Sequence, residues 1–387
     1  PGNGWANQRR LIVHSRNVSD LFPATKIWAG NRYSASPLLP EASPALLWTA
    51  TNGSTPFRVN LHSTGDVGHT LVVGATGAGK SVLVNTMLAQ WRRYHGAQVF
   101  LFDVGGSGYL LAEAVGGTHY TLASDDDPGL ILQPLSRIDQ DGERMWASSW
   151  LETLLELSSV PITPEKRNQL ARALRILAAD PVPMRTLSNL RIQVQDADIR
   201  EALREFCRGG TYGHLLDGSS ETIEDGSVGG SVERATYQVF ELSQIRELSP
   251  SVFIPILLYL FRVVERQLNP DRPTVIVLEE VWSALMESRF ADRIKQWLLT
   301  LRKQNAAVIL VSHTPAQIAD LESREVILDS CPTKIYLPNP DASETESARL
   351  YQSMGLNERE IQIIARATKK KHYFYKCPVG SRLFDLD

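Results

Sequence analysis

A short apolar segment that leads directly into a glycine-rich loop is the feature that most constrains the fold of this chain. Residues 69–81 read HTLVVGATGAGKS, and the spacing Gly74-x-x-x-x-Gly79-Lys80-Ser81 is that of a phosphate-binding P-loop. The glycines allow successive N–H groups to point at a triphosphate. Lys80 can reach the β- and γ-phosphates, and the Ser81 hydroxyl can bind Mg²⁺.

The residues that follow the loop complete the expected context. The segment SVLVNTMLAQWRRY predicts a helix, whose N-terminus adds a favourable dipole to a bound phosphate. A strand before the loop and a helix after it argue against a chance match to the motif. We therefore predict that nucleotide and Mg²⁺ bind along a continuous run of residues: Gly74, Ala75, Thr76, Gly77, Ala78, Gly79, Lys80, Ser81 and Val82.

The composition is that of an ordinary globular chain. Of its 387 residues, 43% are hydrophobic and 21% are charged, which allows two or three domains or one large α/β core with an insertion. The net charge of −3 gives no sign of a protein that coats DNA. Three widely spaced cysteines argue against a disulfide framework or a zinc site, so a reducing cytoplasm is expected.

The longest apolar run, VFIPILLYLF at 252–261, is too short to span a bilayer and contains Pro255. We predict a buried helix there and no transmembrane segment. No signal peptide is recognised, and the chain begins at Pro1 without a methionine, which suggests a fragment of a longer protein.

Hydrophobic periodicity divides the chain into five expected regions. They are an extended lead-in with short strands at 1–60, a first core region with the P-loop at 61–125, a helical insertion at 126–230, a second core region at 231–340, and a C-terminal helix and hairpin at 341–387. The expected core strands are 70–73, 98–102, 235–242, 274–280, 306–312 and 333–338, and the expected core helices are 80–94, 250–268 and 289–304. Short connections between strands and helices predict an α/β fold with a mostly parallel sheet.

A second acidic strand end is expected beside the P-loop. The segment TVIVLEEVW is a buried strand that ends in Glu279 and Glu280. In P-loop ATPases the first acid holds Mg²⁺, usually through water, and the second polarises the attacking water as general base. The usual first residue is Asp, so Glu279 alters the geometry. The alternative is that two glutamates simply end a surface strand.

Four further features are candidates for a functional role, and each of them also has a purely structural interpretation. Asp103 ends a core strand at the edge where ligands collect, but it can equally cap the following turn. Arg302 can reach a neighbouring copy's γ-phosphate or lie exposed at a helix end. His313 stands where a polar γ-phosphate sensor belongs, or is satisfied locally. A basic cluster after the last helix, more typical of a solvated surface than of a nucleic-acid site, comprises Arg366, Lys369, Lys370 and Lys371.

Taken in order, several motifs resemble one family from about residue 55 to the end: GATGAGKS, FDVGGSG, TYGHLLDG, LEEVW, TLRKQN, KIYLPNP and GLNEREI with RLFDL. This pattern is similar to the TrbE-type conjugal transfer ATPases of type IV secretion systems, in the FtsK/HerA branch of RecA-like NTPases. The P-loop is shared widely, whereas TYGHLLDG and YLPNP are more particular.

The resemblance implies a RecA-like core with a helical insertion, a homo-hexamer, and ATP hydrolysis with Mg²⁺. It also implies a peripheral place on the bacterial inner membrane, other type IV secretion components as partners, and a separate N-terminal domain. By position, Lys80 and Ser81 match the Walker A residues, and Glu279 with Glu280 the Walker B pair. Arg302 lies in an Arg-Lys-x-Asn motif. His313 replaces a common Gln, which with Glu279 puts the catalytic rate in question.

Two alternatives stay open. A DNA translocase of the same branch would require a basic pore, and the charge of the chain does not indicate DNA as a partner. A nucleotide-gated assembly subunit would bind ATP and barely hydrolyse it. The sequence has no base-reading motif of GTPases and no LSGGQ of ABC cassettes. A small-molecule kinase would not require some 200 residues between Lys80 and Glu280.

Overall fold

The computed structural model describes residues 28–51, 53–65, 67–121, 130–223, 236–279 and 282–386. Several predicted features lie outside these residues. They are Glu280, the first 27 residues of the lead-in, and residues 126–129 and 224–230 of the expected helical insertion.

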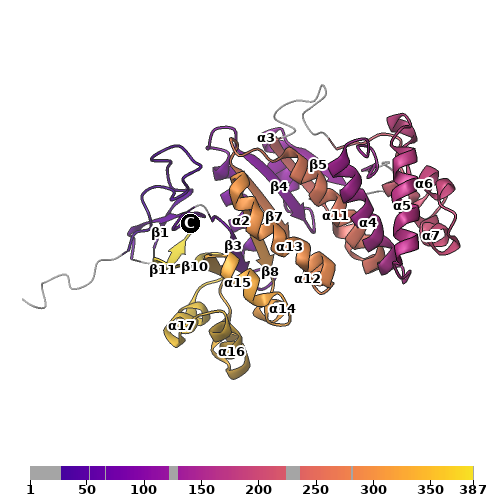
Figure 1. Cartoon of the computed structure of the whole chain (residues 1–387). Coiled ribbons are helices and arrows are strands. Elements are labelled where there is room, and N and C mark those ends of the chain that lie inside the picture. The colour runs from indigo at the N-terminus through magenta and orange to yellow at the C-terminus, as the bar shows by residue number, and fades with distance from the viewer. Residues whose placement is uncertain are drawn as a thin grey trace, which may run out of the picture.

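One large sheet forms the centre of the described chain (Figure 1). Its order is β2-β1-β11-β10-β9-β3-β8-β7-β4-β6-β5. The seven strands from β9 to β5 are parallel to one another. They are β9 (Thr333–Tyr336), β3 (Thr70–Val73), β8 (Ala306–Ser312), β7 (Thr274–Glu279), β4 (Gln98–Asp103), β6 (Tyr237–Glu241) and β5 (Thr118–Thr121). The predicted α/β class with a mostly parallel sheet is therefore confirmed.

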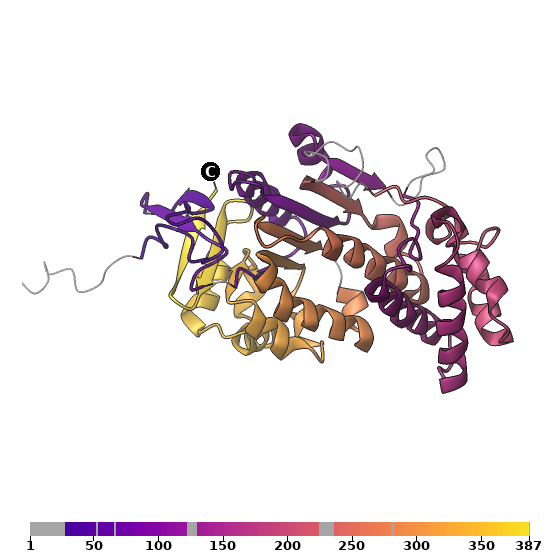
Figure 2. The same cartoon turned by 45° about the horizontal axis from the view of Figure 1, so that its top comes forward.

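Four antiparallel strands extend the sheet beyond β9. The predicted C-terminal hairpin is present as β10 (His372–Cys377) and β11 (Gly380–Asp385). Two strands of the lead-in, β1 (Leu47–Ala50) and β2 (Pro56–Val59), pair with each other, and β1 pairs with β11. Figure 2 shows these indigo and yellow strands together at one end of the molecule. The sequence predicted the short strands of the lead-in and the C-terminal hairpin, but not that these two sets of strands pair with each other.

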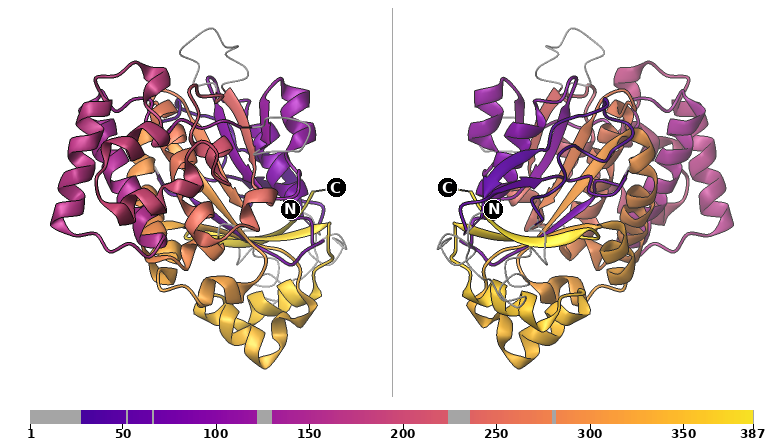
Figure 3. Two further views of the ribbon diagram at one scale, coloured as in Figure 1. Left: turned by 90° about the vertical axis from the view of Figure 1, so that its right-hand side faces the viewer. Right: turned by 90° about the vertical axis from the view of Figure 1, so that its left-hand side faces the viewer.

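Helices cover both faces of the sheet (Figure 3). Helices α2 (Lys80–Trp91) and α3 (Tyr109–Val115) lie on one face, and α11 (Pro250–Gln267) and α13 (Ser288–Thr300) lie on the other. Because side chains alternate along a strand, Val99 and Leu101 of β4 pack with α2, while Phe100 and Phe102 pack with α11. Burial on both faces explains why the central strands β3, β4, β7 and β8 are mostly apolar.

A helical region projects from one end of the sheet. It contains α4 (Asp141–Leu157), α5 (Pro164–Leu177), η1 (Val182–Met184), α6 (Leu187–Gln193), α7 (Ala197–Ala202), η2 (Arg204–Phe206) and α8 (Gly213–Leu216). The two longest helices of this region are α4 and α5. Helix α4 packs against α11, and the Trp150 indole N–H donates to the Pro255 carbonyl at 2.9 Å.

The remaining elements are short. They are α10 (Ser243–Arg246), α12 (Trp282–Leu285), η3 (Leu301–Gln304), α14 (Pro315–Ala319), α15 (Arg324–Ser330), η4 (Pro340–Ser343), α16 (Thr345–Ser353) and α17 (Glu358–Arg366). Helix α17 begins with a capping box: Glu360 N–H donates to the Asn357 side chain at 3.0 Å, and Asn357 N–H donates to the Glu360 carboxylate at 2.9 Å.

The structure corrects some predicted boundaries and adds elements. The helix expected over 80–94 ends at Trp91, and the one over 289–304 becomes a 3₁₀ turn after Thr300. Helices α3 and α16 and strand β5 were not predicted. The apolar run 252–261 is buried within α11, as predicted. Over the described residues, no helix is long and apolar enough to cross a bilayer.

Candidate nucleotide-binding site

The P-loop connects β3 to α2 at the carboxyl edge of the parallel strands. Its conformation depends on glycine at two positions, because Gly77 has φ +74° and Gly79 has φ +108°. Side chains rarely adopt such left-handed backbone, and glycine does so without a steric penalty. Gly79 is also the N-cap of α2, so the free N–H groups of the first helical turn face the loop. This is the arrangement that the sequence predicted for phosphate binding.

Lys80 is held inside the loop by two contacts. Its ammonium group donates to the Gly74 carbonyl at 2.6 Å and lies 2.8 Å from Nδ1 of His313. Because an ammonium group can only donate, Nδ1 must accept, and the imidazole is therefore unprotonated on that nitrogen. His313 follows β8, the parallel neighbour of β3, which explains how a residue 233 positions away reaches the loop.

A cavity of about 460 Å³ opens over the loop. It brings together the predicted residues Lys80, Ser81, Glu279 and His313. Val82 also faces it and is 63% exposed. The lining side chains and backbone come from Thr76, Gly77, Gly79, Lys80, Ser81, Val82, Val104, Glu279, Val311, His313, Lys370 and Tyr373. Oxygen ligands, a buried cation and curled backbone therefore meet in one place.

Glu279 reaches this cavity from the carboxyl end of β7. It is 7% exposed and lies in register with Val311 of β8. The Trp282 indole N–H donates to the Val311 carbonyl at 2.6 Å, which ties the segment after β7 to the next strand. Ser81 and Glu279 thus supply a hydroxyl and a carboxylate to the same cavity, and Mg²⁺ prefers such oxygen ligands.

Asp103 has a structural role in the turn after β4. Its side chain is buried, and its oxygens accept hydrogen bonds from the Ser107 hydroxyl at 2.9 Å and from the Gly108 N–H at 2.6 Å. The neighbouring Val104, rather than Asp103, lines the cavity. The geometry favours the turn-capping alternative over the predicted contact with the cofactor.

Arg302 precedes β8 and so lies at the amino ends of the parallel strands, whereas the P-loop lies at their carboxyl ends. It is exposed in η3, which precedes β8, whereas His313 follows β8. A seven-residue strand is about 20 Å long, so the Arg302 backbone is too far from this copy's P-loop for its side chain to reach a phosphate there. Any contact of Arg302 with a γ-phosphate has to involve another copy of the chain.

Two residues of the C-terminal hairpin region complete the site, and neither was predicted to do so. Lys370 N–H donates to the Ala78 carbonyl at 3.0 Å, and the Tyr373 hydroxyl donates to the Gly79 carbonyl at 3.3 Å. The sequence signal was the basic cluster, but a solvated surface was the favoured interpretation. Lys371 lies 3.3 Å from Asp385, and Arg366, Lys369 and Lys370 are all exposed, but Lys370 also lines the cavity.

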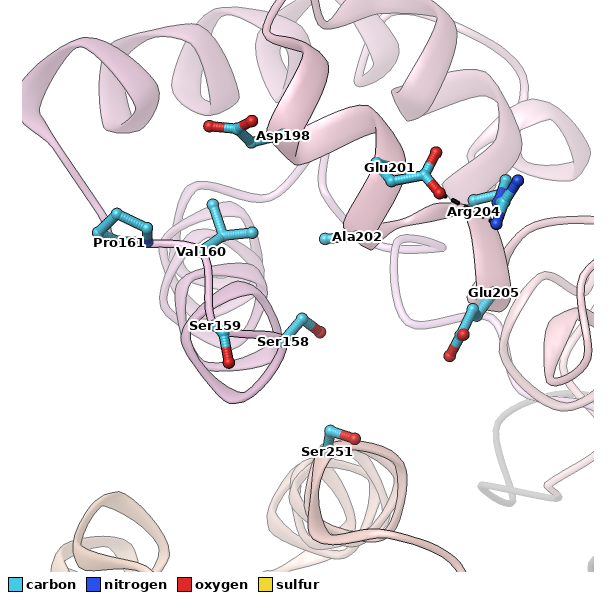
Figure 4. A pocket seen from close by; sticks show the side chains of 10 residues that line it. All are labelled: Ser158, Ser159, Val160, Pro161, Asp198, Glu201, Ala202, Arg204, Glu205 and Ser251. Atoms are coloured by element: carbon cyan, nitrogen blue, oxygen red, sulfur yellow. Dashed lines mark ion pairs between the residues drawn. The ribbon is translucent and has the colours of Figure 1, made fainter.

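A second cavity, of about 570 Å³, lies among the helices of the projecting region (Figure 4). Its charged lining is mostly acidic, with Asp198, Glu201 and Glu205 beside Arg204. Glu201 pairs with Arg204 at 3.0 Å, and Asp198 pairs with Lys166 at 2.7 Å. Carboxylates repel a triphosphate, so this cavity does not compete with the P-loop as a nucleotide site.

The P-loop between β3 and α2, with the acidic end of β7 across the cavity, defines the class: a P-loop NTPase fold. The chain belongs to the TraG P-loop domain family, whose model matches residues 61–141 and 183–377. Most of α4 and all of α5 fall in the unmatched interval.

Curated relatives refine this assignment. The whole chain is 40% identical to a probable conjugal transfer protein TrbE of Sinorhizobium fredii, and covers 57% of it. It is also 40% identical to the conjugal transfer protein TrbE of Rhizobium radiobacter and covers 46% of that protein. The chain thus spans about half the length of these relatives. The resemblance to TrbE-type proteins is confirmed.

Solved structures confirm the fold. VirB4 of Thermoanaerobacter pseudethanolicus matches with a TM-score of 0.70 over 90% of this chain and 98% of that one, at 16% identity. The plasmid coupling protein TrwB in complex with ADP and Mg²⁺ matches with a TM-score of 0.55 over 88% of this chain and 89% of that one, at 15% identity. At these identities the matches establish a shared fold.

Proposed function

We propose that this chain is the ATP-hydrolysing motor portion of a TrbE-type protein in a conjugative type IV secretion system. The observation that carries the proposal is the convergence of Lys80, Ser81 and Glu279 on one cavity above the P-loop. The names of the similar proteins supply the biological context, and the ADP and Mg²⁺ in the TrwB complex support the choice of ligand.

The chain's own residues fit ATP with Mg²⁺. The P-loop N–H groups bind the phosphates, and Lys80 reaches the β- and γ-phosphates. Ser81 and Glu279 are the residues that would hold the metal. When bound, Mg²⁺ neutralises charge that develops on the phosphates. Under this proposal a γ-phosphate competes with His313 for the Lys80 ammonium, and the 2.8 Å contact between Lys80 and His313 supports a role for His313 as γ-phosphate sensor.

Two further residues act in hydrolysis under this proposal. Glu280, the residue after Glu279, is the general base that orients the attacking water. Arg302 inserts into the site of a neighbouring copy, because β8 separates it from its own. The proposal therefore requires an oligomer, and a homo-hexameric ring satisfies it.

The wider context follows the relatives. We propose that the ring energises pilus assembly or transfer of substrate, peripherally on the inner membrane and together with other secretion components. We retain the division of the chain into five regions at residues 60, 125, 230 and 340. The helices α4 to α8 fall within its 126–230 insertion.

The test is steady-state ATP hydrolysis against protein concentration for the parent chain, Glu280→Gln and Arg302→Ala. We expect turnover per chain to rise with concentration in the parent and to vanish in both variants. An equimolar mixture of the two inactive variants should regain a fraction of the activity, because mixed interfaces pair an intact Glu280 with an intact Arg302.

Other results would contradict parts of this proposal or favour one of the two alternative functions. If the mixture stays inactive although each variant binds ATP, Arg302 does not act between copies. ATP binding without turnover by the parent at any concentration would favour the nucleotide-gated assembly subunit. Strong stimulation of turnover by duplex DNA would favour the DNA translocase.

A further inference from the structure

We propose that Lys370 is a second cationic nucleotide-binding residue, which contacts the α- and β-phosphates from the C-terminal hairpin region. The proposal rests on the proposed function, since it assumes that the P-loop cavity binds a nucleoside triphosphate. It assigns a role to one residue of the basic cluster that follows the last helix. The P-loop motif does not include this residue.

The first observation is that this segment is attached to the P-loop itself. The Lys370 N–H donates to the Ala78 carbonyl at 3.0 Å, and a Cβ atom on Gly79 would lie 3.3 Å from the Lys370 Cα. Strand β10 begins two residues later and pairs antiparallel with β9, so its first residues lie at the carboxyl edge of the parallel strands. The sheet therefore fixes Lys370 beside the loop.

The second observation is the backbone of Lys370. It has φ +62°, a left-handed conformation that glycine or asparagine adopts most readily. A lysine in this conformation has a strained backbone. Residues other than glycine with a strained backbone cluster at ligand sites. Lys370 is exposed and is one of the residues that line the nucleotide cavity.

The position along the loop identifies the phosphates. The Thr76 hydroxyl and the Lys80 ammonium group both lie beside Nδ1 of His313, and Lys80 reaches the β- and γ-phosphates in a P-loop. Lys370 instead adjoins Ala78 and Gly79, whose stretch of the loop cradles the α- and β-phosphates. Lys370 and Lys80 thus act on different portions of the same ligand.

The experiment compares three variants of the chain by titration with fluorescent ADP and with a non-hydrolysable ATP analogue. Lys370→Gly removes the ammonium group and keeps the left-handed backbone without strain. Lys370→Arg keeps the charge. Lys369→Ala removes an exposed neighbouring charge of the same cluster and is the matched control.

We expect Lys370→Gly to raise the Kd of both nucleotides about tenfold, since a charge-assisted hydrogen bond is lost. The melting temperature of the nucleotide-free chain should stay unchanged or rise, because the strain is relieved. Lys370→Arg should stay within about threefold of the parent. For Lys370→Gly, the Kd should also depend less on salt concentration than in the parent.

Equal Kd values for Lys370→Gly and the parent would overturn the proposal and leave the proposed function intact. An equal increase in Kd for Lys369→Ala would also overturn it, because any positive charge of the cluster would then have the same effect on nucleotide binding. A loss confined to the ATP analogue would overturn the assignment to the α- and β-phosphates. If the parent chain binds neither nucleotide, the proposed function fails together with this inference.

Discussion

The contact between the P-loop and the C-terminal hairpin predicts a specific energetic coupling between Gly79 and Tyr373. A Cβ atom placed on Gly79 would lie 2.7 Å from the Tyr373 hydroxyl, which is closer than real Cβ contacts. The Tyr373 side chain is fully buried, so its ring cannot swing away. Gly79→Ala therefore forces strain in the loop, overlap with the hydroxyl, or both.

The magnitudes follow from these two effects. Placing alanine at φ +108° costs about 1–2 kcal/mol of backbone strain, and overpacking adds about 1–3 kcal/mol. Tyr373→Phe removes one hydrogen bond to Gly79 and should cost about 1 kcal/mol. In the double variant the overlap disappears, so its cost should fall short of the sum of the single variants by about 1–2 kcal/mol.

The assay is urea-induced unfolding of the parent, both single variants and the double variant. Gly116→Ala is the matched control, because Gly116 also has a left-handed backbone, at φ +71°, but nothing lies within 4 Å of its Cβ position. It should cost strain only, about 1 kcal/mol, and show no coupling to Tyr373→Phe. Additivity of Gly79→Ala and Tyr373→Phe to within about 0.5 kcal/mol would refute the proposed contact.

Three further predictions concern the rest of the fold. Burial raises the pKa of Glu143, but hydrogen bonds from Arg266 and Arg262 outweigh it and lower the pKa below its usual value. The ionised Glu143 side chain therefore stabilises the fold above pH 4.5, and this stabilisation decreases as the pH falls below that value. Glu143→Gln should lower the free energy of unfolding in urea at pH 7, and this loss should be smaller in acid. Burial raises the pKa of Cys331 to about 12, so iodoacetamide at pH 8 should modify it only after denaturation, as mass spectrometry of the peptides would show. Trp150→Phe leaves the buried Pro255 carbonyl without its indole donor and should lower stability by about 1–3 kcal/mol in thermal unfolding, and an unchanged melting temperature would contradict this contact.

Much of the core could be predicted because its signals are local. Strands β3, β7 and β8 each contain an unbroken run of three to six apolar residues and are buried on both faces, and the P-loop has a fixed spacing. Parallel strands place their carboxyl ends at one edge, so Lys80, Glu279 and His313 could be expected to meet there. The structure brings all three to one cavity.

The features that could not be predicted depend on long-range pairing. No local pattern indicates that β1 pairs with β11. Nor does one indicate that Lys370 contacts the P-loop at Ala78, which is 292 positions earlier in the sequence. Helix α3 and strand β5 were missed because segments of seven and four residues carry little periodicity. Asp103 had two equally plausible roles until the turn geometry favoured one.

Strand β8 links the two ends of the proposed catalytic machinery. His313 follows it at the nucleotide cavity, and Arg302 precedes it at the opposite edge. All seven of its residues are buried, and it pairs with β3 on one side and β7 on the other, so it cannot stretch or shift alone. Under the proposed function, one rigid strand would therefore hold His313 at the γ-phosphate and Arg302 at the contact with a second copy, at a fixed separation of about 20 Å.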